Sequence, residues 1–474
     1  MTDELRIQIE SAALHGNYDV RRLRVTEGIS RLFDAEVEIV WTGHADIPGG
    51  ETLIGADVSV HWASDDGAGR TLHGIVIEVE DLHAETQLRA QRLTIAPKAH
   101  SLRLVQTQDI FMDESVPSVI RAKLEALGLA TNLQSRLLTD YPIREFIVQF
   151  QETDHAFVSR LAENLGISYF FESSEVDTHF VLTDHNGGFP RHEPVHFHAG
   201  GERRAVFQLR SRHRLIPGFY AIHDYNYRTP QSEIDGSHQL DGGLGGVIEF
   251  GAHVKSDEEA AVLARIRAEE SQCEQLVFEG KSHIPSFGAG VRVLVDEHPD
   301  LGSVELLLVE VIHEAVAVVG NASSAEPTRY ENRFRAIPAS APFRPKRVTP
   351  RPSIHGLLTG LVDAGGAPPD ARYAQIDEHG RYMVRFFFDP TAPGERPPSR
   401  PIRMLQNHAG ENYGTHFPLK PGTEVAIGFV HGDPDRPVIV GAIPNPIKPS
   451  PVTGASPGVH RMRTSTGITV DMVE

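Results

Sequence analysis

The stretch FIVQFQETDHAFVSRLAENLGISYFFE, residues 146–172, predicts a helix that runs directly into a strand. Thr153 or Asp154 can cap the helix, because short polar side chains accept hydrogen bonds from the first free backbone N–H groups. Three apolar residues then follow on one helical face: Phe157, Leu161 and Leu165. Gly166 suits the left-handed position that ends a helix, and ISYFFE beyond it is typical of a buried strand.

Two further helices are expected from the same signals. SVPSVIRAKLEALGL, residues 115–129, has a proline in the first turn and a glycine, Gly128, at the end. SDEEAAVLARIRAEE, residues 256–270, begins with Ser256 and Glu259 at capping-box spacing. Helices are therefore few, and each has a clear beginning.

Most of the remaining chain alternates apolar and polar residues, as half-buried strands do. In the first hundred residues this pattern recurs in LRIQIE, YDVRRLRVTEG, RLFDAEVEIVW, DVSVHW, RTLHGIVIEVEDL and QRLTIAPKAHSL. Short strands with turns between them predict an antiparallel meander that closes into a barrel. The fold class expected from the residues is mainly β with a few helices.

A proline-rich segment, RAIPASAPFRPKRVTPRPSI, interrupts this pattern at residues 335–354. It has no periodicity, so we expect an extended linker, with residues 346–353 as the boundary. Five strand-like segments follow within about ninety residues, the size of a small OB-type barrel. They are HGLLTGLVD, GRYMVRFFFDP, RPIRMLQNH, TEVAIGFVHGD and RPVIVGAIPN.

Composition excludes several classes of partner. The 474 residues carry 45 Lys+Arg against 64 Asp+Glu, a formal charge of −19, and no basic block that would follow a phosphate backbone. Nucleic acid is therefore not an expected partner.

The start, MTDELRIQIE, lacks the apolar run of a signal peptide, so the chain is expected to fold in the cytosol. The single cysteine, Cys273, is interpreted as structural because no catalytic cysteine signature accompanies it.

The segment HEPVHFH, residues 192–198, contains the H-E-x-x-H pattern of zinc proteases. That chemistry needs both histidines on one helical turn, and Pro194 inside the motif opposes a helix. The alternation past Pro194 predicts a strand with His196 and His198 on one face. These two residues are the metal candidates, weighed against solvated strand-face histidines, which we favour.

GDPDRP, residues 432–437, separates two apolar segments. Asp433, Pro434 and Asp435 form turns for backbone reasons, and Pro437 can open the next strand. We therefore interpret Gly432, Asp433, Pro434, Asp435, Arg436 and Pro437 as a hairpin tip with a local ion pair, rather than as a ligand site.

Four stretches together resemble a known family. Residues 146–172 and YGTHFPLKPGTEVAIGFVHGDPDRPVIVGAIPNP, residues 413–446, are similar to characteristic segments of VgrG proteins, the spike-tip components of type VI secretion systems. DYNYRTP, residues 224–230, and YENRFRAIPASAPFRP, residues 330–345, carry the same resemblance. It covers essentially the whole chain.

The resemblance implies an architecture and a role. Residues 1–345 would form a phage-hub-like, ring-forming region of two related β-barrel modules with inserted helices. Residues 354–445 would form the OB-fold, and 446–474 the neck and the start of a trimeric β-helix needle, near whose start the chain stops. Thr464, Thr466, Ile468 and Val470 would begin its first strand.

The role implied is mechanical, without catalysis, cofactor or metal. A homotrimer would cap the hexameric Hcp tube and carry the needle, with an effector or a PAAR-type tip protein, through a target membrane that it meets only transiently. It would be cytoplasmic before firing and then secreted by the type VI system without a signal peptide.

Three alternatives stay open. The chain could be the hub and spike of a phage tail or of an extracellular contractile injection particle. It could be a zinc metallohydrolase built on His196 and His198. It could be a carbohydrate-binding barrel, although its two tryptophans, Trp41 and Trp62, lie outside the OB region.

Overall fold

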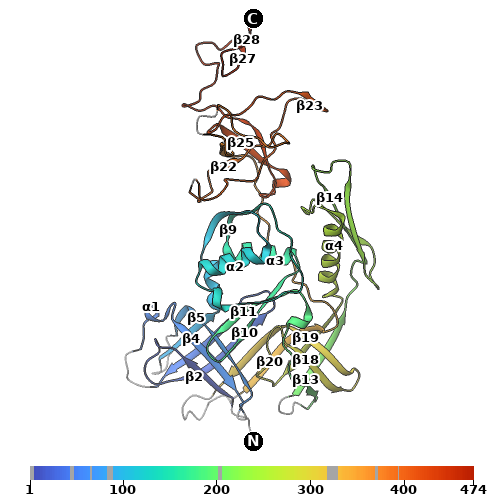
Figure 1. Cartoon of the computed structure of the whole chain (residues 1–474). Helices are drawn as coiled ribbons and strands as arrows, with labels where there is room; N and C mark the ends of the chain where they lie inside the picture. Colours follow the sequence, from blue (N-terminus) through green and yellow to red (C-terminus); the bar gives the residue numbers. More distant parts are fainter. Residues whose placement is uncertain are drawn as a thin grey trace. The chain divides into compact units, whose positions relative to one another are not determined.

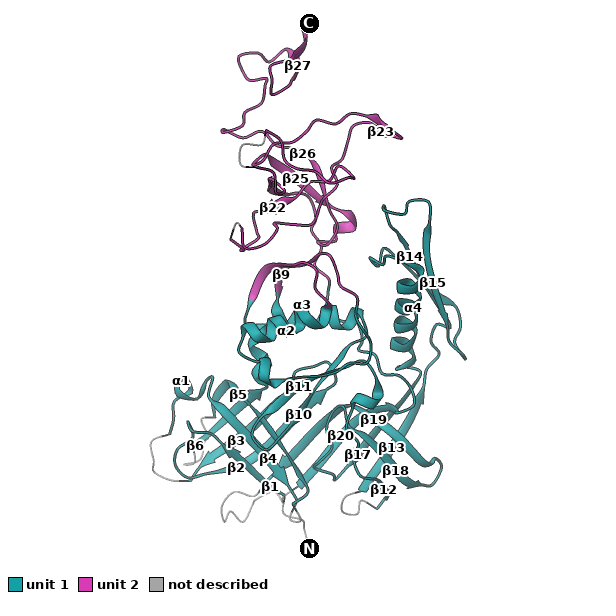
Figure 2. Cartoon of the chain, in the orientation of Figure 1, with its two compact units in different colours: residues 1–105, 116–141, 153–350 teal, residues 106–115, 142–152, 351–474 magenta. Residues whose placement is uncertain are grey.

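The computed structural model describes residues 5–42, 47–64, 67–82, 89–200, 205–317, 329–368, 372–392 and 394–473. The chain divides into two compact units, coloured separately in Figure 2. Unit 1 comprises residues 1–105, 116–141 and 153–350, and unit 2 comprises residues 106–115, 142–152 and 351–474. Unit 2 therefore takes two short segments from the first third of the sequence.

The first module of unit 1, drawn in blue in Figure 1, is an antiparallel sheet. Its six strands follow the order β1-β4-β5-β6-β3-β2. Its strands are β1 Arg6–Glu10, β2 Tyr18–Gly28, β3 Asp34–Trp41, β4 Asp57–Ala63, β5 Gly69–Leu82 and β6 Arg89–Ala96. Buried residues alternate along them, as the sequence pattern predicts; Leu23, Val37 and Leu93 are fully buried. A short helix, α1 Gly50–Leu53, precedes β4.

The second module continues the same sheet through a pairing of β2 with β19. Its six strands follow the order β19-β18-β12-β13-β17-β20, and β20 also pairs with β19, so this module is a closed barrel. The strands are β12 Val195–Phe197, β13 Ala205–His213, β17 Leu276–Ser282, β18 Arg292–His298, β19 Gly302–Val316 and β20 Arg329–Pro338. The expected mainly β fold is confirmed, with a closed barrel in the second module. The meander expected for the first hundred residues is wrong, because β1 pairs with β4 and β3 pairs with β6, so strands that follow one another in the chain are not all neighbours in the sheet.

Three helices and two small sheets complete unit 1. The helices are α2 Val116–Ala126, α3 Asp154–Asn164 and α4 Asp257–Gln272, with short 3-10 turns at Lys98–Arg103, Ala130–Asn132 and Asn186–Gly188. The sheets are β10 Ser168–Ser173, β11 Thr178–Thr183 and β8 Leu133–Arg136, and β15 Glu233–Gln239, β14 Phe219–Tyr225 and β16 Gly246–Phe250. Ile222 and Ile234 of the second sheet pack against Leu263 of α4.

The helix boundaries expected from the sequence are confirmed. The Thr153 hydroxyl accepts a hydrogen bond from the Ala156 N–H at 3.1 Å, and Gly166 follows α3 with φ +68°. Ser256 caps α4 by accepting from the Glu259 N–H. Gly128 ends the α2 region with φ +73°. None of the described helices is long and apolar enough to cross a membrane.

Unit 2 is built on a four-stranded sheet in the order β22-β21-β25-β26. Its strands are β21 Leu358–Val362, β22 Val384–Phe386, β25 Glu424–Phe429 and β26 Pro437–Ala442, and β25 is followed by the 3-10 turn Val430–Gly432. Three two-stranded pairs are added: β7 Gln106–Phe111 with β9 Ile147–Thr153, β23 Ala409–Gly410 with β24 Tyr413–Gly414, and β27 Val459–Arg463 with β28 Thr469–Val473.

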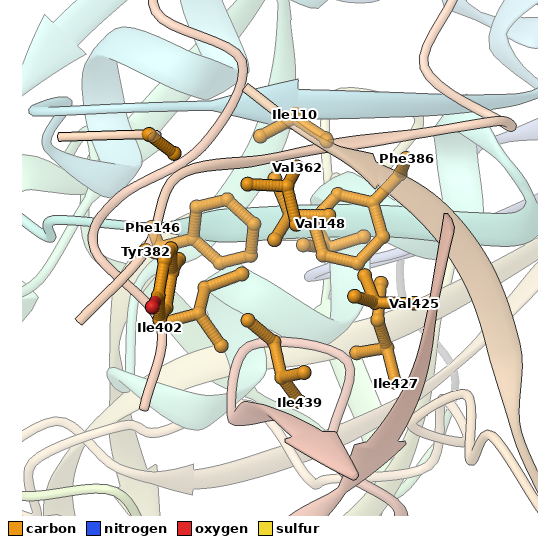
Figure 3. Packing of buried hydrophobic residues seen from close by; sticks show 12 residues of the cluster. Ile110, Phe146, Val148, Val362, Tyr382, Phe386, Ile402, Val425, Ile427 and Ile439 are labelled. Atoms are coloured by element: carbon orange, nitrogen blue, oxygen red, sulfur yellow. The ribbon is translucent and has the colours of Figure 1, made fainter. Parts of the chain in front are cut away.

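The core of unit 2 includes side chains from the two early segments. Ile110, Phe146 and Val148 are buried among Phe386, Ile427 and other residues of the four-stranded sheet (Figure 3). Phe150 adds an edge-to-face contact with Phe388, with ring centroids 5.5 Å apart. The early segments are thus part of the hydrophobic core of unit 2.

Two expected strands differ in the structure. RPIRMLQNH, residues 400–408, is predicted as a strand, but only single bridges form there, Tyr382 with Ile402 and Met404 with Ile439. Pro401 cannot donate to a ladder, which helps to explain the short pairing. Thr464 and Thr466 lie in the turn between β27 and β28, where the Thr464 N–H bonds to the Ile468 carbonyl, because Gly467 (φ +97°) allows the chain to reverse.

Candidate functional site

Residues 192–198 adopt extended backbone. His192 lies before β12, where its Nε2 is 2.9 Å from the Ser286 hydroxyl, and His196 lies inside β12. The two histidines therefore share no helical turn, and the zinc-protease geometry is absent from this segment. The strand expected past Pro194 is confirmed.

His196 and His198 both lie at the surface. The His196 side chain is 68% exposed, and its Nδ1 is 3.7 Å from a Glu297 carboxylate oxygen that is also exposed. Among the residues that the structure describes, no three His, Cys, Asp or Glu side chains gather closely enough to hold a metal ion. A strand-face pair therefore lacks the third ligand that a zinc site requires.

GDPDRP forms the turn between β25 and β26. The Arg436 N–H bonds to the Asp433 carbonyl at 2.9 Å, and the Asp435 N–H bonds to the Asp433 carboxylate at 3.0 Å. His431 and Gly432, just before it, have φ of +55° and +73°. The segment is a hairpin tip, as its composition indicates.

The ion pair at this tip has a distant partner. Arg351, from the proline-rich linker, donates to Asp433 at 2.6 Å and to Asp435 at 3.2 Å. A second Asp435 oxygen accepts the backbone N–H of Val148 at 2.7 Å. The tip therefore joins three segments of unit 2, two of which sequence reasoning did not connect to it. The position of Arg351 between Pro350 and Pro352 is a sequence feature that could have singled this residue out.

Burial makes this cluster sensitive to pH. Burial, followed by the Asp435 charge, raises the pKa of Asp433 to about 6, although Arg351 opposes the shift. A carboxyl whose folded pKa is raised contributes stability that is present below its unfolded pKa, near 3.8, and is lost as pH rises through about 6.

We therefore expect Asp433→Asn to change the pH dependence of unfolding. Between pH 4 and pH 7 the wild type should lose about 2 kcal/mol of stability relative to the variant, since one pKa unit corresponds to about 1.4 kcal/mol. Chemical denaturation of both proteins across this range measures the difference. The exposed Asp300→Asn is the matched control, and parallel curves for Asp433→Asn and wild type would contradict the expectation.

The linker is also bound within unit 1, through side chains that the sequence did not single out. Arg344 donates to Glu269 at 2.6 Å and to the Asp184 carbonyl at 2.8 Å. The Thr349 N–H and hydroxyl both bond to Glu163, at 2.9 and 2.8 Å. The extended chain is therefore held along its length by charge-assisted hydrogen bonds.

Cys273 packs beneath this linker. Burial raises the pKa of its thiol to about 12, and the Arg344 N–H lies 3.4 Å from the sulfur. A thiol that stays protonated is a poor nucleophile, which agrees with its interpretation as a structural residue.

Comparison with known proteins identifies both units. The family model described as phage tail baseplate hub (GPD) matches residues 26–319, and the type VI secretion system/phage-baseplate injector OB domain matches residues 374–443. The type VI secretion system spike protein VgrG5 of Pseudomonas aeruginosa is 28% identical over 91% of this chain and 56% of its own length. For VgrG1a of the same organism, the identity is 28% over 90% of this chain and 67% of the relative.

Solved structures share the fold. The E. coli c3393 protein, a type VI component described as similar to T4 tail proteins gp27 and gp5, aligns with TM-score 0.68 and 24% identity over 92% of this chain and all of that chain. A VgrG-containing PdpA–VgrG complex aligns with TM-score 0.61 and 9% identity over 100% of this chain and 93% of that chain. The chain spans roughly half to two thirds of the length of the curated relatives compared here. The VgrG spike proteins are relatives that it resembles, and the chain belongs to the phage tail baseplate hub (GPD) family.

Proposed function

We propose that this chain is the structural spike-tip component of a type VI secretion system, acting as a homotrimer that caps the hexameric Hcp tube. The observation that carries the proposal is the duplication within unit 1, where two six-stranded modules share one strand order. Three chains would offer six similar modules, which matches a six-fold tube rim.

The work of such a protein is mechanical. Force from a contracting sheath would pass through barrels whose strands are joined by continuous hydrogen-bonded ladders, and no step needs a catalytic group, a cofactor or a metal. The chain would be cytoplasmic before firing and then leave through the secretion system, crossing a target membrane only transiently.

The needle is proposed to begin at the β27–β28 hairpin. Met462, Ile468 and Met472 are each more than half exposed on it. A two-stranded hairpin is marginal alone in water, so three copies that bury these side chains against one another would be far more stable. The full-length needle would carry an effector or a PAAR-type tip protein.

The proposal is tested by mass and symmetry in solution. Light scattering is expected to give three times the chain mass of 52.2 kDa, and electron microscopy three-fold particles. Co-sedimentation with Hcp rings should then retain the trimer. A monomer at all concentrations, with no particles and no retention on Hcp, would contradict the proposal.

The alternatives give different results. A phage tail or extracellular injection particle is favoured if the gene lies beside capsid or particle genes rather than sheath, Hcp and AAA+ ATPase genes. A zinc metallohydrolase requires stoichiometric zinc that a His196→Ala variant loses. A carbohydrate-binding barrel requires retention on an oligosaccharide column by unit 2.

A further inference from the structure

The two modules of unit 1 correspond strand by strand. The order β1-β4-β5-β6-β3-β2 matches β12-β18-β19-β20-β17-β13, with the same neighbours at every step. The direction differs at one step, since β1 pairs antiparallel with β4 and β12 pairs parallel with β18. The bulges agree as well. β5 is irregular between Val76 and Glu78 against β6, and β19 between Leu308 and Glu310 against β20.

The same match holds for β2 and β13. β2 has its irregularity between Val20 and Arg22, and β13 between Val206 and Gln208. The residues around these bulges repeat in type, with V-x-x-L-R at residues 20–24 and again at 206–210. Bulges fix register, so the correspondence can be carried residue by residue: Arg24 to Arg210, and Glu310 to Glu78.

One pairing has no counterpart among the residues that the structure describes. β2 joins the two modules by pairing with the second half of β19, from Gly28 opposite Glu310 to Arg22 opposite Val316. The corresponding strands are β13 and the second half of β5. In the part of the chain that the structure describes, β13 pairs only with β17 and, at residues 205 and 206, with β12. Residues 78–82 of β5 pair only with β6.

We propose that β13 of one copy pairs with the second half of β5 of another copy, repeating between subunits the contact that β2 and β19 make within one. The transferred register sets Arg214 opposite Glu78, Arg212 opposite Glu80 and Arg210 opposite Leu82. This inference rests on the assembly in the proposed function and names the strands that build it.

The charges on the open edges of β5 and β13 support a second copy of this chain as the binding partner. The open half of β5 presents Glu78, Glu80 and Asp81. The open half of β13 presents Arg210, Arg212 and His213, and Arg214 follows directly after it. The Arg212 and Glu80 side chains are 52% and 56% exposed. Opposite charges directly across an antiparallel pair attract, and burial of two open strand edges satisfies their backbone groups. Because β13 and β5 differ, the contact is heterologous and three copies can close a ring of six modules.

A disulfide tests the register. In a variant with both Arg212→Cys and Glu80→Cys, the proposed register places the two cysteines of neighbouring copies directly opposite each other. Their Cβ atoms should then lie about 5 Å apart, close enough for the thiols to oxidise to a disulfide. Non-reducing gels are expected to show covalent dimers and trimers, and nothing larger. The control, Arg212→Cys with Asp81→Cys, moves one thiol to the other face of the strand and should cross-link at least tenfold less.

Charge exchange tests the pairing independently. Arg214→Glu or Glu78→Arg alone should weaken assembly about tenfold, and the two together should restore it, whereas Arg191→Glu, an exposed cation outside both strands, should leave it unchanged. Three-fold particles that neither cross-link nor respond to the exchange would overturn this interface but leave the spike function intact. A wild type that stays monomeric, together with an Arg212→Cys/Glu80→Cys variant that does not cross-link, would overturn both.

Discussion

Replacing Phe146 with alanine is expected to lower the free energy of unfolding of unit 2 by about 3 to 5 kcal/mol. The ring is buried in the core of unit 2 and lies 6.3 Å, centroid to centroid, from the ring of Phe386. Alanine removes this packing and leaves a cavity that the surrounding side chains can fill only in part. The expected loss falls in unit 2, although Phe146 lies far before residues 351–474, the main segment of that unit.

Hydrogen exchange locates the effect. Amides of β25 and β26 should exchange faster in Phe146→Ala, while those of β19 in unit 1 keep their protection, because local stability follows the core that an element shares. Leu138→Ala is the matched control, since that side chain is 76% exposed. Equal loss of protection in both units, or none in β25, would contradict the assignment of Phe146 to the unit 2 core.

Arg70→Met is expected to destabilise unit 1 by about 3 to 5 kcal/mol. Arg70 forms an ion pair with Glu27, whose side chain is 4% exposed. His313 is buried beside the pair, with its Nε2 3.6 Å from a Glu27 oxygen. Removing the guanidinium leaves a buried carboxylate without its cation, and the loss of that partner costs far more than the net value of the pair.

A second substitution separates this cause from lost packing. Glu27→Met added to Arg70→Met removes the unpaired charge and should recover most of the stability, because apolar residues can replace a buried ion pair at little cost. Arg31→Met is the control: Arg31 pairs with Glu310 at 3.6 Å but is 68% exposed, so about 1 kcal/mol or less is expected. Thermal or denaturant unfolding measures all four proteins, and an unrecovered double variant would point to packing instead.

Local signals in the sequence were sufficient to predict where the helices begin and end. Thr153, Ser256, Gly128 and Gly166 take the cap positions that their chemistry favours, since a cap depends on residues within one turn. Pro194 likewise decided against a helix at HEPVHFH, because the proline ring acts on its own backbone. The turn at GDPDRP follows from Asp433 and Pro434 for the same local reason.

Contacts between distant segments could not be predicted from the sequence. Nothing in the residues next to Val148 shows that it enters the unit 2 core, or that Asp435 accepts its N–H. The same holds for Arg351 at the hairpin tip and for the pairing of β2 with β19.

What the sequence by itself determined, then, is the mainly β class, the three long helices with their caps, the turn at GDPDRP and, through its resemblance, the family. The tertiary structure alone decided which core each strand joins and which charges are buried together. The physical reason is that periodicity and capping are set within a few residues of backbone, whereas burial and strand pairing depend on side chains brought together across hundreds of residues.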